Sequence, residues 1–228
     1  MCGRYTLRAS PQQMALAFHV NMAIDLHPRY NIAPTQQAPV VRSLADGNRE
    51  LAELRWGLIP RWATDRSIGS RMINARSETA ATKPAFREAM RERRCLIPAD
   101  GFYEWQKQGG QKHPMFVHCR DDAPFAFAGL WEHWTDEQHQ PLETFTILTA
   151  PANDQLRPLH DRMPIIIRPE NYQRWLDPTM TDAAAVEIFL ADPPEDLVLQ
   201  PVGSRVNSVA NDDPTCIVPV RAQKTLWD

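Results

Sequence analysis

Proline limits what this chain can fold into more than any other feature of its sequence. The 228 residues include 20 prolines against 9 glycines, and the prolines are spread over nearly the whole length. Proline lacks an amide hydrogen and disrupts the interior of helices and sheets, so this spacing favours many turns and short elements over a few long helices. The length suits one large domain or two small ones with a proper hydrophobic core.

Helical and extended patterns follow one another without a regular order. Ser10 and Pro11 predict a capped amphipathic helix over the residues that follow, and Pro84 opens a strongly basic helix over 84–94. A polar loop is expected at 63–71. Extended, alternating or β-rich runs predict strands at 28–42, 51–62, 95–105, 114–120, 125–134, 144–150, 163–168 and 197–202. Two more helices are expected at 169–176 and 181–190.

The order of these elements predicts the fold class. The chain shows no internal repeat, no Gly/Ser-rich linker and no regular strand–helix–strand alternation. We therefore expect one α+β domain over residues 1–228, with a mixed or antiparallel, barrel-like sheet flanked by helices. Neither G-x-G-x-x-G nor G-x-x-x-x-G-K-[ST] occurs, so we expect no nucleotide-dependent chemistry and no cofactor.

The termini and the cysteines bear on location and metals. The first residues, MCGRYTLRAS, hold no apolar stretch of the signal-peptide kind, and no run approaches the ~20 apolar residues that span a membrane. Four scattered cysteines without C-x-x-C spacing are typical of reduced thiols. We expect a cytoplasmic protein without membrane contact, and no metal. Five residues are conceivable zinc ligands, but their spacing matches no usual zinc-binding pattern: Cys95, Cys119, His113, His118 and His133.

Charge is distributed unevenly along the sequence. Residues 1–94 carry 15 Lys and Arg against 8 Asp and Glu, whereas residues 95–228 carry 10 against 20. Arginine outnumbers lysine 21 to 4, and arginine suits bidentate phosphate contacts. A basic half on a chain of net charge −3 is compatible with local nucleic-acid binding. An uneven but merely solvated surface would give the same counts.

Cys2 has a chemistry that no internal cysteine shares. It follows the initiator methionine and is small enough for Met1 to be removed, which would leave an α-amine and a thiol on adjacent carbons. Both groups have a nucleophilic fraction at neutral pH. Such a 1,2-aminothiol condenses with an aldehyde to an imine, on which the thiol closes to a thiazolidine ring. Gly3 lets the backbone approach a substrate closely.

Seven segments follow one another in a specific order. They are MCGRY, RYNIAP (29–34), RWGLIPRW (55–62), INARSETA (73–80), CLIPADGFYEW (95–105), TILTAPAN (146–153) and HDRMPI (160–165). In order and spacing they closely resemble the SOS-response-associated peptidase family, the abasic-site processing proteins. The resemblance runs from residue 2 to at least residue 167, and 201–209 looks like the family's closing segment.

The resemblance implies four catalytic residues. Cys2 matches the family's cross-linking nucleophile, and Glu104, between aromatic residues, matches its catalytic carboxylate, suited to proton transfer. His160 matches the active-site histidine, which exchanges protons near neutral pH. Asn74 matches the asparagine that orients the abasic sugar, and an amide can only position. Without the family, Glu104 is a salt-bridged strand glutamate and His160 a plain surface or core residue.

The resemblance also places residues against DNA. Arg4, Arg76 and Arg162 match positions that face the DNA backbone, where they would neutralise phosphates without reading sequence. Thr149 could donate a hydroxyl hydrogen bond at the same site, and Asn31 is assigned to the same DNA-facing set.

Three tryptophans receive different interpretations. Trp62 lies in the loop where the family stacks apolar or aromatic side chains on an unpaired base, although loop 61–71 is more polar here than we expect of close relatives. Trp56 and Trp105 are expected in the core.

The function implied is covalent capture of a DNA lesion. Cys2, after removal of Met1, would cross-link to the ring-opened aldehyde of an abasic site in single-stranded DNA, or at a junction with duplex, and shield it. The protein would act as a monomer, with peptidase activity limited to Met1 and lyase-like chemistry on the DNA.

Three alternatives compete with this reading. An N-terminal-nucleophile amidohydrolase also begins with exposed Cys and Gly, but does not explain the later motifs. A thiol peptidase would use Cys2, His160 and Asn153. A non-catalytic single-strand-binding module would form no denaturant-resistant adduct.

Overall fold

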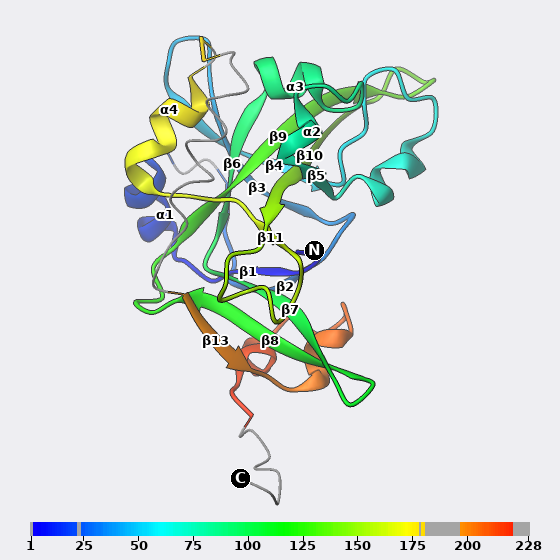
Figure 1. Ribbon diagram of the computed structural model, residues 1–228. Helices are drawn as coiled ribbons and strands as arrows, with labels where there is room; N and C mark the ends of the chain where they lie inside the picture. Colours follow the sequence, from blue (N-terminus) through cyan, green and yellow to red (C-terminus); the bar gives the residue numbers. More distant parts are fainter. Residues whose placement is uncertain (1, 22–23, 178, 181–196, 221–228) are drawn as a thin grey trace, which may run out of the picture.

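A closed barrel of five β-strands forms the centre of the computed structural model (Figure 1). The strands pair in the order β10-β4-β3-β6-β9, and β9 pairs back onto β10. Only β10 and β4 run parallel, so the barrel is mixed. Its strands are β3 (Gln37–Ser43), β4 (Arg49–Trp56), β6 (Arg94–Ala99), β9 (Phe125–Thr135) and β10 (Pro141–Pro151).

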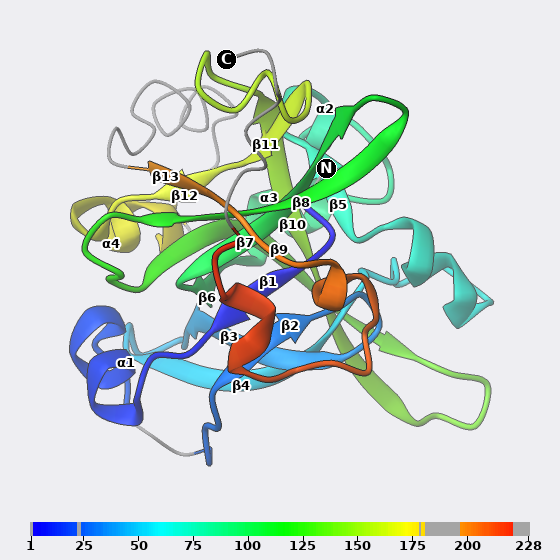
Figure 2. The ribbon, with the colours of Figure 1, turned by 90° about the horizontal axis from the view of Figure 1, so that it is seen from below.

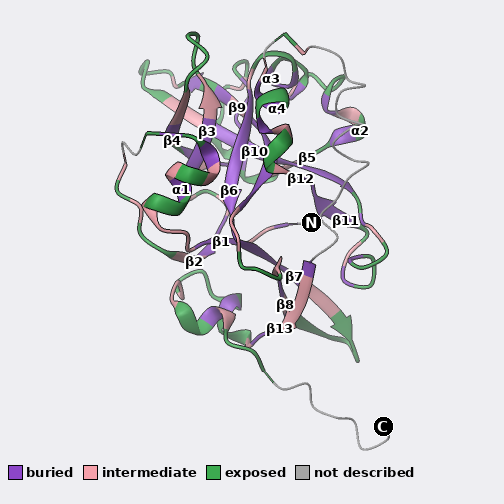
Figure 3. Ribbon diagram, turned by 90° about the vertical axis from the view of Figure 1, so that its left-hand side faces the viewer, coloured by how far each residue is buried: buried purple, intermediate pink, exposed green. Residues whose placement is uncertain are grey.

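The structure describes residues 2–21, 24–177, 179–180 and 197–220. Figure 3 shows that β6, β9 and β10 are buried along most of their length. Inside the barrel, Trp56 stacks on Phe145 with ring centroids 6.2 Å apart. Burying an apolar side chain of this size stabilises the fold by roughly 1.5–3 kcal/mol. These side chains fill the barrel, so the site lies at its end and not inside it.

A second, fully antiparallel sheet closes one end of the barrel. Its order is β13-β8-β7-β1-β2. The strands are β1 (Tyr5–Leu7), β2 (Arg29–Ile32), β7 (Gly101–Gln108), β8 (Gln111–Cys119) and β13 (Leu197–Pro201). The chain passes from barrel to second sheet at Asp100, which is buried and accepts a hydrogen bond of 2.5 Å from the Thr6 hydroxyl.

The other elements are short. Three strands attach to the barrel: β5 (Asn74–Arg76), β11 (Arg162–Pro164) and β12 (Ile166–Ile167). The α-helices are α1 (Pro11–Phe18), α2 (Ser77–Ala80), α3 (Arg87–Glu92) and α4 (Tyr172–Leu176). The 3-10 helices are η1 (Arg66–Arg71), η2 (Pro169–Asn171), η3 (Ser204–Asn207) and η4 (Pro214–Ile217). Within the described ranges, no helix has the length and apolarity needed to cross a membrane.

The barrel-like mixed sheet expected from the sequence is confirmed, and the helices that flank it are few and short. Helix α1 begins as predicted, because Ser10 and Gln13 form a reciprocal capping box at its first turn. Residues 95–105, expected as one run, lie on two strands of different sheets. The helix expected at 181–190 lies outside the described residues.

The basic helix predicted over 84–94 is wrong in its extent. Only Arg87–Glu92 is helical, and its N-cap residue, Phe86, makes no capping hydrogen bond through its side chain. Arg94 belongs to β6 instead, where it pairs with Leu130 of β9. Its buried guanidinium donates to the carbonyl oxygens of Met90 and Trp175, at 3.0 and 2.8 Å. These tertiary contacts outweigh helix propensity at the end of the run.

Gly57 lets the chain leave the barrel and return beside the same strand. Its φ is +120°, and a Cβ placed there would lie 2.5 Å from the carbonyl oxygen of Gly69. Strand β4 pairs with β10 before this excursion, and β5 pairs with β10 after it. The close backbone approach at Gly57 therefore sets where Asn74, the first residue of β5, is placed.

We expect Gly57→Ala to lower the free energy of unfolding by roughly 2–4 kcal/mol, because it adds a steric clash to an unfavourable φ. Gly47→Ala is the matched control: its φ is +82°, but nothing lies within 4 Å of the added Cβ. The control should cost about 1 kcal/mol. Urea unfolding of both variants measures the difference, and equal losses would contradict the packing argument.

Candidate active site

The N-terminal strand is fixed deep in the structure. Strand β1 lies between β2 and β7, and Tyr5, fully buried, packs against two barrel side chains. Its ring centroid is 5.3 Å from that of Trp56 and 5.8 Å from that of Phe127, both in edge-on arrangements. Edge-to-face pairs of this kind add about 0.5–1.5 kcal/mol to area burial. Cys2, three residues earlier, is thereby held at the junction of barrel and second sheet.

Cys2 is completely buried in this chain, in which Met1 precedes it. Burial raises the pKa of its thiol well above the ordinary value, and the negative charge of nearby Glu104 raises that pKa further. The sulfur lies 3.8 Å from the carbonyl oxygen of Arg4. The thiol is therefore protonated at neutral pH and is not an activated thiolate.

Asn74 holds the backbone of Cys2. Its Nδ2 donates a hydrogen bond of 2.9 Å to the Cys2 carbonyl oxygen. Its buried Oδ1 has no hydrogen-bond donor among the described residues. Because a buried unpaired acceptor is costly, this oxygen is poised to accept from an amine or hydroxyl brought to Cys2.

An open cavity of about 800 Å³ brings two of the predicted catalytic residues together. Glu104, on β7, is 6% exposed, and His160 precedes β11. The full lining is Glu104, Trp105, Lys107, Lys112, Pro158, Leu159, His160, Asp161 and Asn207. A carboxylate that also acts on the Cys2 thiol thus faces a space large enough for a substrate.

One ring nitrogen of His160 makes two contacts. Its Nδ1 accepts a hydrogen bond of 3.0 Å from the amide of Arg162, and it also lies 2.6 Å from Oδ1 of Asp161. The first contact requires a bare Nδ1, so that the neutral ring carries its proton on Nε2. The second requires a protonated Nδ1. The ring can therefore make only one of these two contacts as a hydrogen bond at a time.

Arg162 is held inside the protein. It is 9% exposed and forms a two-pronged pair with Glu78 of α2, with Nη2 at 2.9 Å from Oε2. The same nitrogen donates to the carbonyl oxygen of Thr149 at 2.6 Å. Thr149 is fully buried. This geometry fixes the turn that carries His160, but it leaves Thr149 without a surface that DNA could contact in this structure.

Arg4 and Asn31 fasten the C-terminal segment under the second sheet. Arg4 donates to Oδ1 of Asn31 at 3.0 Å and to the carbonyl oxygen of Val206 at 2.8 Å. The amide of Asn31, fully buried, donates to the carbonyl oxygens of Val206, Ser208 and Asn211 at 3.2, 3.0 and 2.8 Å. Figure 2 shows η4 lying against β2. Asn31 therefore has a structural task here, and its contact with DNA stays a prediction.

The other two residues predicted to contact DNA lie on the surface. Arg76, at the end of β5, is exposed, and Trp62 is 60% exposed in the excursion after Gly57. Both positions leave the side chain open to a ligand, and their contact with DNA stays a prediction. The five zinc candidates named from the sequence gather into no cluster of three or more possible ligands within the described part of the chain.

Sequence reasoning missed several cavity residues. Trp56 is in the core as predicted, but Trp105 is half-buried, lines the cavity, and donates from Nε1 to Oδ1 of Asn207 at 2.8 Å. Strand alternation carried the signal, since Trp105 and the exposed Lys107 share one face of β7. No sequence signal marked Glu78 as the partner of Arg162.

A barrel whose end is closed by a second sheet, with the cysteine at position 2 held at their junction, defines a distinct class of protein. Residues 1–209 match the family model described as SOS response associated peptidase (SRAP). The chain belongs to the SRAP family.

Curated relatives span nearly the full chain. It is 41% identical over 223 residues to the abasic site processing protein YoqW of Bacillus subtilis (strain 168), covering 95% of this chain and 99% of YoqW. It is 31% identical over 228 residues to the abasic site processing protein YedK of Escherichia coli (strain K12), covering 96% of this chain and 100% of YedK. The abasic site processing protein HMCES of Gallus gallus is 32% identical over 225 residues, covering 85% of this chain and 66% of HMCES.

Solved structures show the same fold. A crystal structure of a protein from Bacteroides thetaiotaomicron superimposes with a TM-score of 0.86 at 26% identity, covering 96% of this chain and all of that one. A protein from Bordetella bronchiseptica gives a TM-score of 0.76 at 28% identity, covering 89% of this chain and all of that one.

Glu78 gives the site a measurable acid dependence. The hydrogen bond from Arg162 lowers the pKa of Glu78 to about 2, from 4.5. A depressed carboxylate pKa stabilises the fold above the unfolded value, and that contribution is lost as pH falls from 4.5 towards 2. The difference in unfolding free energy between wild type and Glu78→Gln should be constant above about pH 5 and shrink below it. Unfolding titrations at several pH values measure it, and a difference independent of pH would refute the pairing.

Proposed function

We propose that this protein processes abasic sites in single-stranded DNA by forming a covalent adduct through Cys2 after loss of Met1. The observation that carries the proposal is the placement of Cys2: its carbonyl is held by Asn74, and its thiol lies in the field of Glu104. Family membership, and relatives named abasic site processing proteins, supply the substrate class.

The α-amine that loss of Met1 exposes on Cys2 sets the order of bond formation. The α-amine attacks the ring-opened aldehyde first and, as water leaves, an imine forms between the lesion and Cys2. The thiol then adds to the imine carbon, and its proton passes to the imine nitrogen, which closes the thiazolidine. Glu104 relays that proton, while His160, which lines the same cavity, supplies one to the sugar oxygen during ring opening.

Asn74 and the arginines act by position. The unpaired Oδ1 of Asn74 accepts from the α-amine or from a sugar hydroxyl, and so orients the reacting carbon towards Cys2. Arg76, exposed beside this residue on β5, contacts a backbone phosphate without reading sequence. Trp62 provides a flat surface for an unpaired base. Arg162 orients the His160 turn through its pair with Glu78.

The geometry argues against a thiol peptidase built on Cys2, His160 and Asn153. Oδ1 of Asn153 accepts a hydrogen bond of 2.9 Å from the amide of Leu156, so this asparagine shapes a turn. The contacts of the His160 Nδ1 are with Arg162 and Asp161 instead. The proposal therefore includes no peptidase step other than the release of Met1.

Cys2→Ala should abolish the stable adduct with single-stranded DNA that carries one abasic site. Alanine is also small enough for Met1 removal, so the variant retains the α-amine but cannot close the ring, and only an adduct trapped by a reductant should remain. Cys119→Ala, at a partly buried cysteine on β8, is the control. Intact-mass measurement is the readout. A full-strength adduct from Cys2→Ala without reductant would refute the proposed thiazolidine linkage.

Glu104→Gln should slow adduct formation and release by about 10²–10⁴, because glutamine keeps the shape of the side chain but carries no proton. Affinity for undamaged single-stranded DNA should stay near wild type. Glu53→Gln, at an exposed strand glutamate, is the matched control. Time courses of cross-linking and of transfer to competitor DNA provide the readout, and wild-type rates in both directions would make Glu104 structural.

A further inference from the structure

The hairpin of β7 and β8 projects from the body of the protein beside the cavity (Figure 1). Its outer part, residues 105–114, reads WQKQGGQKHP and contains two lysines, three glutamines and no carboxylate. It lies in the half of the sequence whose net charge is −10, where a cationic tip is unexpected. The resemblance to the family and the proposed chemistry give these two lysines no role.

The two lysines face each other directly. Lys107 and Lys112 are cross-strand partners in the antiparallel ladder, so their side chains emerge on the same face. Like charges in directly opposed positions destabilise a strand pair. Both are exposed, and no ion pair joins either to an acidic residue in the described part of the chain. An anion between them would remove this repulsion.

The hairpin presents this pair in a fixed geometry. Its ladder is continuous from Phe102 opposite Val117 to Gln108 opposite Gln111. The two central turn residues, Gly109 and Gly110, have φ of +57° and +77°, as in a two-residue turn that matches the twist of its strands. The ammonium groups are therefore carried on a regular ribbon, at a set distance from the catalytic end of β7.

The pair shares a cavity with the proposed chemistry. Lys107 and Lys112 line the same 800 Å³ space as Glu104 and His160. Lys107 is three residues beyond Glu104 on β7, roughly 10 Å along the strand. A single-stranded nucleic acid whose damaged sugar reaches Glu104 would carry its neighbouring phosphates past this ribbon.

We propose that Lys107 and Lys112 form a phosphate clamp for the nucleotides next to the lesion. The proposal rests on the proposed function, and it adds a sequence-independent contact that anchors the strand outside the reacting centre. An acidic protein segment would satisfy the same two charges. The continuity of the hairpin with the Glu104–His160 cavity favours the DNA strand.

The test is the salt dependence of binding by Lys107→Gln/Lys112→Gln. The probe is a short single-stranded oligonucleotide with one tetrahydrofuran site, which lacks an aldehyde and reports binding alone. Each phosphate contact to single-stranded DNA contributes about 0.7 to the slope of log affinity against log salt, so the double variant should lose up to about 1.4. Lys107→Arg/Lys112→Arg should restore the wild-type slope.

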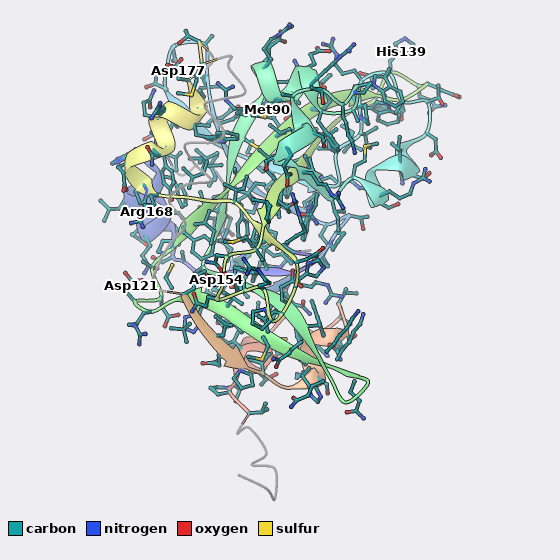
Figure 4. The ribbon with its side chains drawn as sticks, viewed as in Figure 1. Met90, Asp121, His139, Asp154, Arg168 and Asp177 are labelled. Atoms are coloured by element: carbon teal, nitrogen blue, oxygen red, sulfur yellow. The ribbon has the colours of Figure 1, made fainter. Side chains whose placement is uncertain are left out.

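The matched control is Arg120→Gln/Arg174→Gln, which removes the same charge far from the cavity. Arg120 follows the other end of β8 next to Asp121, which lies across the molecule from the hairpin tip, and Arg174 is exposed on α4 (Figure 4). An unchanged slope in the lysine variant, or an equal loss in the control, overturns the clamp. Either result also leaves an acidic protein segment as the candidate ligand of the two lysines.

A parallel assay keeps this outcome apart from the proposed function. Each protein is mixed at saturating concentration with DNA that carries a natural abasic site, and the covalent adduct is quantified under denaturing conditions. A normal adduct with an unchanged slope refutes the clamp alone. A reduced slope with no adduct from any protein refutes the covalent chemistry and leaves the clamp as a DNA contact.

Discussion

The insertion of β1 between β2 and β7, with Tyr5 packed against the barrel, is the constraint on which the rest of the site depends. An N-terminus is normally the freest part of a chain. Here ladder hydrogen bonds on both sides and two edge-on aromatic contacts hold it, so that Cys2 lies at a defined point three residues before Tyr5. Cys2, although it lies next to the N-terminus, is therefore held in a fixed position, as a residue in the middle of a chain would be.

The polar groups near Cys2 fall into two sets, those tied to other protein groups and those that line the cavity. Asn74 and the Arg162–Glu78 pair are tied to backbone atoms or to each other, and they set geometry. Glu104 and His160 line the open cavity instead. The buried thiol, protonated by desolvation, is kept from reacting with solutes that lack the means to engage the amine first.

Much of this could be predicted from the sequence, and the failures have physical causes. The capping box at Ser10 and the alternating strands are local signals, and local signals were sufficient there. The predicted end of the helix at 84–94 was wrong, because the Arg94 side chain donates a hydrogen bond to a residue that is remote in the sequence. Trp105 was expected in the core but lines the cavity, where its partner Asn207 comes from a segment 102 residues away in the sequence. Motifs singled out the candidate catalytic residues, whose roles stay predictions, but the burial and pairing of these residues depended on tertiary structure.

The contact between Arg4 and Val206 joins residues 202 positions apart. Ribosomes deliver a chain from its N-terminal end, so the first strand waits for nearly the whole sequence before its surroundings are complete. Loop closure over such a span comes late among folding events, after the local hairpins have formed. The surroundings of the first strand are thus complete only after the segment that carries Val206 has been made. A chain whose synthesis stops early would expose Cys2 without the side chains that surround it in the complete fold.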